Sequence, residues 1–351
     1  MSKKTRISIL VPVYNEEQAI PFFLDRIDPV IADIRTEFGC DVELIFTDNC
    51  SNDKTQALLA SGSASRPHMR VFRFSHNVGF QRSIISGYAL STGDACVQID
   101  VDLEDPPELI KEFIRAWQDG YKVVYGIRKA RHEGFLMRLS RSALYGIINR
   151  FSEGRIPVGA GDFRLVDRRV IDIVCQVNDA EPYLRGLIAN LGFSQKGIPF
   201  DRDPRVAGTT KFSIYQYASI GVDGVLQSSI KPLTMALWIG VGAFFSSILL
   251  ATYYIVARLL GAIVQDGFVS LAALGLLQFS ILLLMIGINS LYLGRVYRQV
   301  FRRPISVVEF SINSGIIACN SSAVFWPGDP SSLKMHSHSQ EQSAATLQKS
   351  D

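Results

Sequence analysis

The sequence predicts an α/β domain with a mostly parallel sheet over residues 1–211, followed by two transmembrane helices. Three observations predict this fold class. Short apolar runs alternate with helical patterns along the first part of the chain. Polar and charged side chains follow the ends of these runs, which is where ligands bind in α/β sheets. Two long apolar segments without any charge come next.

The predicted strands are rich in apolar and β-branched residues. They are "ISILVPV" (7–13), "VELIFT" (42–47), "VFRF" (71–74), "ACVQID" (95–100) and "KVVYGI" (122–127). Residues 19–38 and 80–93 have helical spacing, so we expect helices between the strands. Strands that alternate with helices are typical of a mostly parallel sheet covered on both faces. The apolar run near the N-terminus is short and ends at a proline, so it predicts the first strand and no signal peptide.

Two segments, 233–257 and 267–294, contain no charged side chain. About 20 apolar residues cross the core of a bilayer, so we expect transmembrane helices at 232–258 and 267–294. Buried core helices are the alternative, but such long uncharged helices are rare in soluble proteins. Glycines inside the spans would permit close helix packing, and with it a homo-oligomer; they are Gly240, Gly242, Gly275 and Gly287.

Basic residues predict how these helices are oriented. Lys231 precedes the first span, and Arg295, Arg298, Arg302 and Arg303 follow the second. The positive-inside rule then places the α/β domain and both termini on the cytoplasmic side of the inner membrane. The five cysteines form no Cys-x-x-Cys pair, which agrees with a reduced, cytosol-facing domain. A net charge of +3 indicates no nucleic-acid partner.

The segments that flank the two spans are less regular. Residues 212–231 carry apolar and aromatic side chains at helical spacing, which fits an interfacial amphipathic helix or, equally, an ordinary core helix. Residues 295–351 begin with a basic juxtamembrane stretch, and after Pro304 they become polar and serine-rich. We expect that tail to be largely disordered.

The densest negative charge is in "QIDVDLEDPPEL" (98–109), at the end of a predicted strand. Its carboxylates are those of Asp100, Asp102, Glu104, Asp105 and Glu108. Like charges at close range repel, so a positive partner is expected. Clustered carboxylate oxygens suit Mg²⁺ or Mn²⁺, and Mg²⁺ commonly completes its shell with substrate phosphates. A solvated acidic turn is the alternative, because Asp-x-Asp alone is a weak signal.

Other polar segments mostly follow the remaining strand ends. They are "VPVYNEE" (11–17), "TDNCSNDKT" (47–55), "NVGFQRSIISGY" (77–88), "YGIRKAR" (125–131), "AGDFRLVDRRV" (160–170) and "RVAGTTKF" (205–212). Asp and Asn side chains after the second strand suit the edge of a base or ribose, and basic residues after the fifth suit phosphate. Each segment alone fits an ordinary turn or cap. Their combination in this order is specific.

With these motifs the chain resembles family 2 glycosyltransferases of the GT-A fold, in the branch of dolichyl-phosphate mannose synthases and bactoprenol glucosyltransferases. The resemblance covers residues 6 to about 303 and is carried by "VPVYNEE", "DVDLEDPPELI", "VVYGIR", "GDFRLVDR" and "RVAGTTKF". It implies a Rossmann-like catalytic domain that transfers one sugar, with inversion, from a nucleotide diphosphate sugar to a polyprenyl phosphate such as undecaprenyl phosphate. The product would be a lipid-linked sugar donor for cell-envelope glycans. The bactoprenol branch favours a UDP-linked donor.

The resemblance also implies roles for single residues. The nucleotide sugar would be bound by Pro12, Tyr14, Glu16, Asp48, Asn49, Asp100, Val101, Arg128, Arg205 and Lys211. The metal ion would be bound by Asp100, Asp102 and Glu104, and catalysis would involve Asp102, Asp162 and Arg128. Asp162 lies where the family suggests a catalytic carboxylate.

Two positions depart from the family pattern. The family commonly has Asp-Asp-Gly-Ser where this chain has Asp48-Asn49-Cys50-Ser51, so recognition of the base could differ. Glu104 stands where the family usually has Gln, which adds a negative charge to the metal site.

The acceptor phosphate is largely ionised near pH 7, because its second pKa is about 6. A strong general base is therefore less necessary, and Asp162 could orient Arg164 or the acceptor instead of abstracting a proton. A processive polysaccharide synthase is one alternative, but its Gln-x-x-Arg-Trp motif is absent, since no tryptophan here follows an arginine. A catalytically degenerate membrane scaffold is another, and the intact Asp100, Asp102 and Asp162 argue against it.

Overall fold

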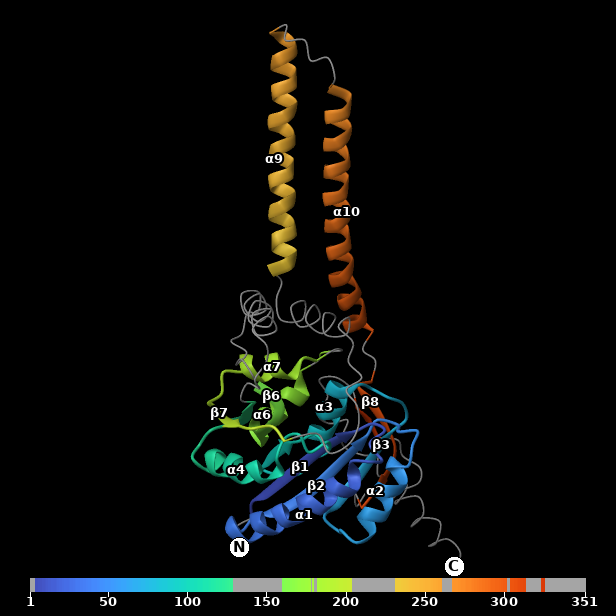
Figure 1. Cartoon of the computed structure of the whole chain (residues 1–351), viewed down its shortest axis with the longest axis vertical. Coiled ribbons are helices and arrows are strands. Elements are labelled where there is room, and N and C mark those ends of the chain that lie inside the picture. Colours follow the sequence, from blue (N-terminus) through green and yellow to red (C-terminus); the bar gives the residue numbers. More distant parts are fainter. Residues whose placement is uncertain are drawn as a thin grey trace, which may run out of the picture. The chain divides into compact units, whose positions relative to one another are not determined.

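The computed structural model describes residues 4–128, 160–177, 179, 182–203, 231–260, 267–301, 304–313 and 323–325. The chain divides into two compact units, an α/β unit and a unit that contains two long helices (Figure 1). The α/β unit takes in the N-terminal part of the chain and also the residues from 302 onward.

One mixed sheet forms the centre of the α/β unit. Its strands are β1 (Arg6–Val13), β2 (Asp41–Asp48), β3 (Met69–Phe74), β4 (Ala95–Gln98), β5 (Val123–Arg128), β6 (Ala160–Asp167), β7 (Gln195–Phe200), β8 (Ser306–Ile312) and β9 (Ala323–Phe325). Their order is β7-β5-β6-β4-β1-β2-β3-β8-β9. Strands β4, β1, β2 and β3 run parallel at the centre, as the alternating pattern predicts. The antiparallel strands β6 and β8 flank this centre on either side.

Helices cover both faces of the sheet. They are α1 (Ile20–Glu37), α2 (Thr55–Ala64), α3 (Phe80–Leu90), the 3₁₀ turn η1 (Pro107–Leu109), α4 (Ile110–Gln118), α6 (Arg168–Gln176) and α7 (Leu184–Asn190). Successive side chains of a strand point to opposite faces. Ile7 and Ile9 of β1 accordingly belong to one buried cluster with α1, α2 and α4, whereas Leu10 belongs to another with α3, α6 and α7.

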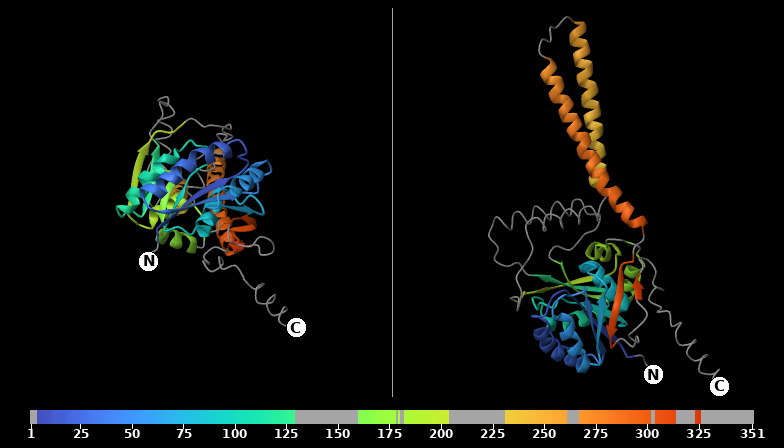
Figure 2. Two further views of the ribbon diagram at one scale, coloured as in Figure 1. Left: turned by 90° about the horizontal axis from the view of Figure 1, so that it is seen from below. Right: turned by 90° about the vertical axis from the view of Figure 1, so that its right-hand side faces the viewer.

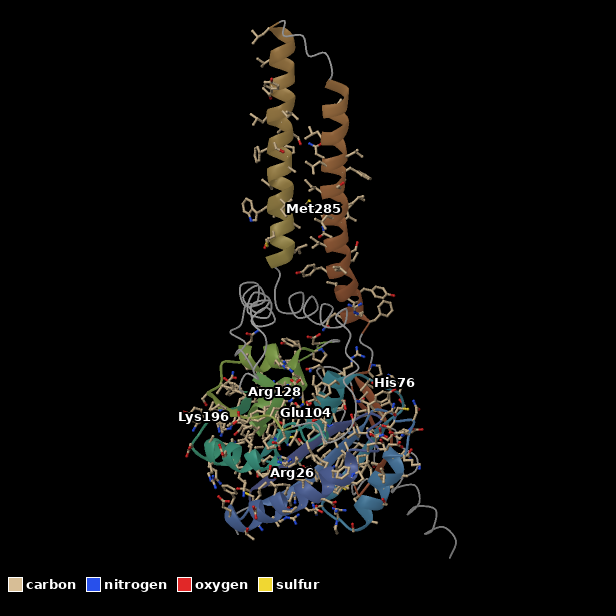
Figure 3. The ribbon with its side chains drawn as sticks, viewed as in Figure 1. Arg26, His76, Glu104, Arg128, Lys196 and Met285 are labelled. Carbon is tan, nitrogen blue, oxygen red and sulfur yellow. The ribbon has the colours of Figure 1, made fainter. Side chains whose placement is uncertain are left out.

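The second unit contains α9 (Lys231–Leu259) and α10 (Gly267–Val300), which lie side by side in both views (Figures 1 and 2). Gly240 permits this approach, since a Cβ there would lie 2.7 Å from Cε of Met285, which is labelled in Figure 3. Both helices are long and apolar enough to cross a membrane, and 6% and 0% of their most apolar stretches are buried in the protein. That exposure argues against the alternative of two buried core helices.

The chain after α10 differs from the expected disordered tail. β8 pairs with β3 and β9 pairs with β8, so residues beyond the long helices complete the central sheet (Figure 2). Val308 is 6% exposed and packs with Phe72 and Phe74. The apolar edge of β3 provides the physical reason, because it offers unpaired backbone groups and apolar surface to an added strand. Residues 212–230 of the predicted interfacial helix and the tail beyond 325 lie outside the described residues.

Candidate active site

Three parallel strands end at the same edge of the sheet and bring the predicted segments together. In the register of the sheet Val13 lies beside Asp48, and Leu10 lies beside Gln98. The loops after β1, β2 and β4 therefore start from one edge, as expected for ligand sites in α/β sheets. These loops carry Tyr14, Asn49 and Asp100.

Hydrogen bonds join the loops after β1 and β2 into one platform. The Asn15 N–H donates to Oγ of Ser51 at 2.9 Å, and the Asn52 N–H donates to Oδ1 of Asn15 at 2.8 Å. The Glu16 N–H donates to Oγ1 of Thr55 at 2.8 Å. Pro12 is buried at the end of β1. The two loops thus form a platform whose geometry does not depend on a ligand.

Three side chains of this platform, those of Asp48, Asn49 and Tyr14, differ in how their polar groups and surfaces are already used within the protein. Asp48 is buried, and its oxygens accept from Oγ of Ser51 at 2.5 Å and from Nη1 of Arg73 at 2.8 Å. By contrast, no residue of the described ranges forms a hydrogen bond with the buried Oδ1 of Asn49. Tyr14 is 43% exposed, which is high for a large aromatic ring. Tyr14 is therefore accessible to a ligand and Asn49 carries an acceptor that the described residues leave unsatisfied, whereas Asp48 holds the loop.

Backbone strain concentrates in the same loops. Asn15, Cys50 and Leu103 have positive φ angles of 56°, 60° and 59°. Positive φ in a residue other than glycine is uncommon, and such strain clusters at binding and catalytic sites. Leu103 lies between Asp102 and Glu104, so the acidic turn is itself held in a strained conformation.

The five carboxylates of the acidic turn divide into two groups. Three are paired with arginines from distant parts of the chain, as follows: Asp105 with Arg128 at 3.0 Å, Glu108 with Arg26 at 2.9 Å, and Glu104 with Arg202. Figure 3 labels Arg26, Glu104 and Arg128 in the α/β unit. Arginine side chains thus supply much of the positive charge that is needed to offset the repulsion between the carboxylates of the acidic turn.

Asp100 and Asp102 form the other group. Asp102 is 7% exposed, and its Oδ1 accepts from the Glu104 N–H at 3.1 Å. Burial and the nearby carboxylates of Asp162, Asp105 and Asp102 raise the pKa of Asp100 to about 8. Ionising Asp100 is therefore costly, and a bound cation would favour its ionised form.

Asp162, at the start of β6, is held by arginines. Nε and Nη2 of Arg185 on α7 donate to its two oxygens at 2.8 and 2.6 Å. Arg164 lies 3.5 Å from Oδ1 of Asp162. Burial alone would raise the pKa of Asp162, but the hydrogen bonds from Arg185 and the charges of Arg164 and Arg128 lower it below its usual value. Asp162 is therefore an ionised carboxylate whose oxygens are already occupied.

Comparison with known proteins assigns the chain to a class of enzymes. Residues 8–174 match the family described as "Glycosyl transferase family 2". An uncharacterized glycosyltransferase of Bacillus subtilis (strain 168), YkcC, is 34% identical over 89% of this chain and 95% of its own length. The chain belongs to glycosyltransferase family 2. It is a glycosyltransferase.

Other relatives of this family 2 glycosyltransferase match it over nearly their whole length. The bactoprenol glucosyl transferase of Shigella phage SfII is 30% identical over 87% of this chain and 98% of its own. Among solved structures, glucosyl-3-phosphoglycerate synthase from Mycobacterium tuberculosis, in complex with Mn²⁺, UDP and glucosyl-3-phosphoglycerate, is 18% identical. That match covers 64% of this chain and 78% of the other, with a TM-score of 0.45.

The described part of the glycosyltransferase brings most of the predicted residues to one edge of the sheet. The guanidinium of Arg128 lies between the acidic turn and β6. It pairs with Asp105 of the turn, and a Cβ at Gly161 of β6 would lie 3.4 Å from its Nε. The exceptions are Arg205 and Lys211, which lie outside the described residues. No group of three or more His, Cys, Asp or Glu side chains converges as a metal site within the described ranges. Asp100 and Asp102 nevertheless fit a divalent cation, because Mg²⁺ is commonly bound by one or two carboxylates together with substrate phosphates.

Several arginines at the site have no motif that predicts them. Arg185, Arg202, Arg73 and Arg26 each bind a carboxylate of the site from another element. The one available signal was electrostatic: a dense group of buried carboxylates must be neutralised, and arginine is suited to bidentate pairing with them.

Proposed function

We propose that this glycosyltransferase transfers a single sugar from a UDP-linked nucleotide sugar to a polyprenyl phosphate, with inversion at the anomeric carbon. The observation that carries the proposal is its similarity to bactoprenol glucosyl transferases over 98% of their length, which takes in the two long apolar helices. Undecaprenyl phosphate is the expected acceptor. The product would be a lipid-linked sugar for modification of cell-envelope glycans.

The donor would lie across the ends of β1, β2 and β4. The exposed ring of Tyr14 suits stacking on the base. Oδ1 of Asn49, which no described residue contacts by a hydrogen bond, suits the base N–H, with Pro12 and Glu16 beside them. Asp48 would act by fixing the loop through Arg73. Asp100, Val101 and Asp102 would hold the diphosphate end.

Asp100 and Asp102 are the residues that would hold Mg²⁺ or Mn²⁺. When bound, such an ion supplies charge stabilisation for a diphosphate leaving group. Glu104, the third predicted ligand, is already paired with Arg202, and this pairing competes with the binding of a cation. Arg128 lies beside Asp105 and Gly161, where its guanidinium could contact a phosphate of the donor or the acceptor.

The reaction needs little acid–base chemistry from the protein. An oxygen of the acceptor phosphate attacks the anomeric carbon, the bond from that carbon to the β-phosphate oxygen breaks, and UDP leaves with the electron pair. The acceptor phosphate is ionised near pH 7, so no proton has to be removed. Asp162, held ionised between Arg185 and Arg164, would orient these guanidinium groups toward the acceptor, and positioning and charge stabilisation would supply the rate.

A polyprenyl acceptor requires a site at a membrane surface. The apolar helices α9 and α10 would anchor the enzyme, and Arg295 and Arg298 after the apolar part of α10 favour a cytoplasmic orientation. Basic residues near the bilayer also attract anionic lipid head groups. Arg205 and Lys211, outside the described residues, remain candidates for phosphate contacts.

The test uses full-length enzyme in detergent with undecaprenyl phosphate, Mn²⁺ or Mg²⁺, and a panel of UDP- and GDP-sugars. Mass spectrometry of the lipid would detect an added sugar, and an Asp102→Ala variant would be assayed alongside. We expect one sugar added from a UDP-linked donor, and loss of product with a chelator or in the variant. No glycosylated lipid from any donor, while the enzyme still binds UDP and Mn²⁺, would contradict the proposed acceptor.

A further inference from the structure

Residues 201–203 are fastened to the acidic turn by several contacts within the α/β unit. The Asp203 N–H donates to the Glu104 carbonyl oxygen at 3.0 Å. The Arg202 guanidinium pairs with the Glu104 carboxylate. Arg26 on α1 pairs with both Glu108 and Asp203, at 2.9 Å in each case. The end of β7 is therefore held to the loop that carries Asp100 and Asp102.

The Glu104–Arg202 pair is the most enclosed of these contacts. The side chain of Glu104 is 14% exposed and that of Arg202 is 30% exposed, whereas Glu108 and Asp203 are 50% and 42% exposed. Exposed ion pairs contribute little, but a pair shielded from solvent is screened less. Glu104 is therefore the carboxylate through which the acidic turn most effectively holds this segment.

Glu104 and Arg202 are also the first two members of a row of alternating charges that leads toward the reacting centre. Nε of Arg202 lies 4.0 Å from Oδ1 of Asp105, and Asp105 accepts from Arg128 at 3.0 Å. Glu104, Arg202, Asp105 and Arg128 thus form a continuous electrostatic chain. A change at Glu104 would therefore alter the electrostatic environment of Arg128, which lies beside Gly161.

We propose that Glu104 and Arg202 form a latch that positions the acidic turn and Arg128 for donor binding, and that Glu104 is not a ligand of the divalent cation. The proposal rests on the function proposed above. The metal would be held by Asp100, Asp102 and the donor phosphates alone. Glu104 would be a positioning residue. The latch would also restrain residues 201–203, which precede Arg205 in the sequence.

The test compares Glu104→Ala, Arg202→Ala and the double variant Glu104→Ala/Arg202→Ala. Mn²⁺ affinity of the protein without donor is measured by electron paramagnetic resonance, and KM for the nucleotide sugar is measured separately. We expect both single variants to keep their Mn²⁺ affinity within about twofold and to raise KM by about two- to fivefold, the size expected of a partly exposed ion pair. The double variant should raise KM by no more than the larger of the two single effects, because the second substitution removes a side chain that the first has already left without its partner.

Opposite results would overturn the latch. Weakening of Mn²⁺ binding by about tenfold or more in Glu104→Ala alone would make Glu104 a ligand. An unchanged KM in both single variants, or a double variant whose effect on KM is the product of the two single effects, would also contradict the proposal. An Asp102→Ala variant tests the proposed function separately, since Mn²⁺ binding that survives this change would contradict its metal site, whereas the KM values of the Glu104 and Arg202 variants decide the latch.

Discussion

Arg185 holds Asp162 by both carboxylate oxygens, at 2.8 and 2.6 Å, from a helix that no site motif of the sequence covers. A carboxylate in a bidentate pair with arginine has little capacity to accept a proton from a substrate. The family resemblance suggests a catalytic carboxylate at this position. The geometry instead favours an orienting role, in keeping with an acceptor that is already ionised.

Removal of Arg185 should leave the buried charge of Asp162 less well compensated, with Arg164 and Arg128 as its remaining cations. We expect Arg185→Gln to lower the melting temperature, because Asp162 would remain ionised beside Asp100 or would have to take up a proton. The double variant Asp162→Asn/Arg185→Gln should be more stable than Arg185→Gln by roughly 1–3 kcal/mol, discounted for the partial exposure of Arg185. Thermal unfolding in detergent measures this difference. A double variant no more stable than the single variant would contradict the pairing.

Binding of the metal should depend on pH through Asp100. The pKa of Asp100 is raised to about 8, so below that pH the group is protonated and a cation must displace its proton. The apparent Mn²⁺ affinity should rise by roughly tenfold per pH unit up to about pH 8 and then level off. Titration of Mn²⁺ at several pH values checks this. An affinity that stays constant between pH 6 and 8 would show that Asp100 carries no such proton.

Cys50 offers a test of backbone strain at the platform. Its φ of 60° favours glycine, which the family commonly has at this position. We expect Cys50→Gly to stabilise the α/β unit by about 0.5–1 kcal/mol, because the left-handed conformation disfavours a Cβ. Cys50→Ala keeps the Cβ and serves as the control, with no gain expected. Thermal unfolding of the two variants should differ in this direction, and equal melting temperatures would exclude strain at Cys50.

The strand after the long helices should matter for stability. Val308 of β8 is 6% exposed within the core, whereas the neighbouring Val307 is only half-buried. Val308→Ala should destabilise the protein by about 1–2 kcal/mol and Val307→Ala by much less. Unfolding measurements on both variants compare the two faces of the strand. Equal effects would mean that β8 does not pack as described.

The apolar pattern of the sequence was sufficient to predict the strands at the centre of the sheet. It did not predict the strands whose place depends on pairing with distant parts of the chain. Residues 7–13 and 42–47 have the apolar runs of buried parallel strands, and β1 and β2 lie there. β6 was identified only as a motif around Asp162, and β8 was expected to be part of a disordered tail. Each owes its place to a partner that sequence periodicity does not identify, since β8 pairs with β3, more than two hundred residues earlier.

The residues of the candidate site also divide into those that the sequence predicts and those that only the fold reveals. The Asp100–Asp102 pair and Asn49 follow strand ends and could be predicted from their position. The partners of Asp105, Glu108 and Glu104 could not be predicted, because Arg128, Arg26 and Arg202 come from elements brought together only by the fold. The five carboxylates of the acidic turn therefore looked alike in the sequence, and the structure shows which arginines pair with Asp105, Glu108 and Glu104.

In the proposed reaction the acceptor phosphate is itself the nucleophile and no protein base is required. The most direct measurement supplies the full-length enzyme, UDP-sugar and Mn²⁺ with either undecaprenyl phosphate or the free alcohol undecaprenol, and follows the lipid by mass spectrometry. We expect a glycosylated product from the phosphate and none from the alcohol, whose hydroxyl would need a base that Asp162 cannot provide. Comparable transfer to undecaprenol would show that the phosphate is not needed as the nucleophile.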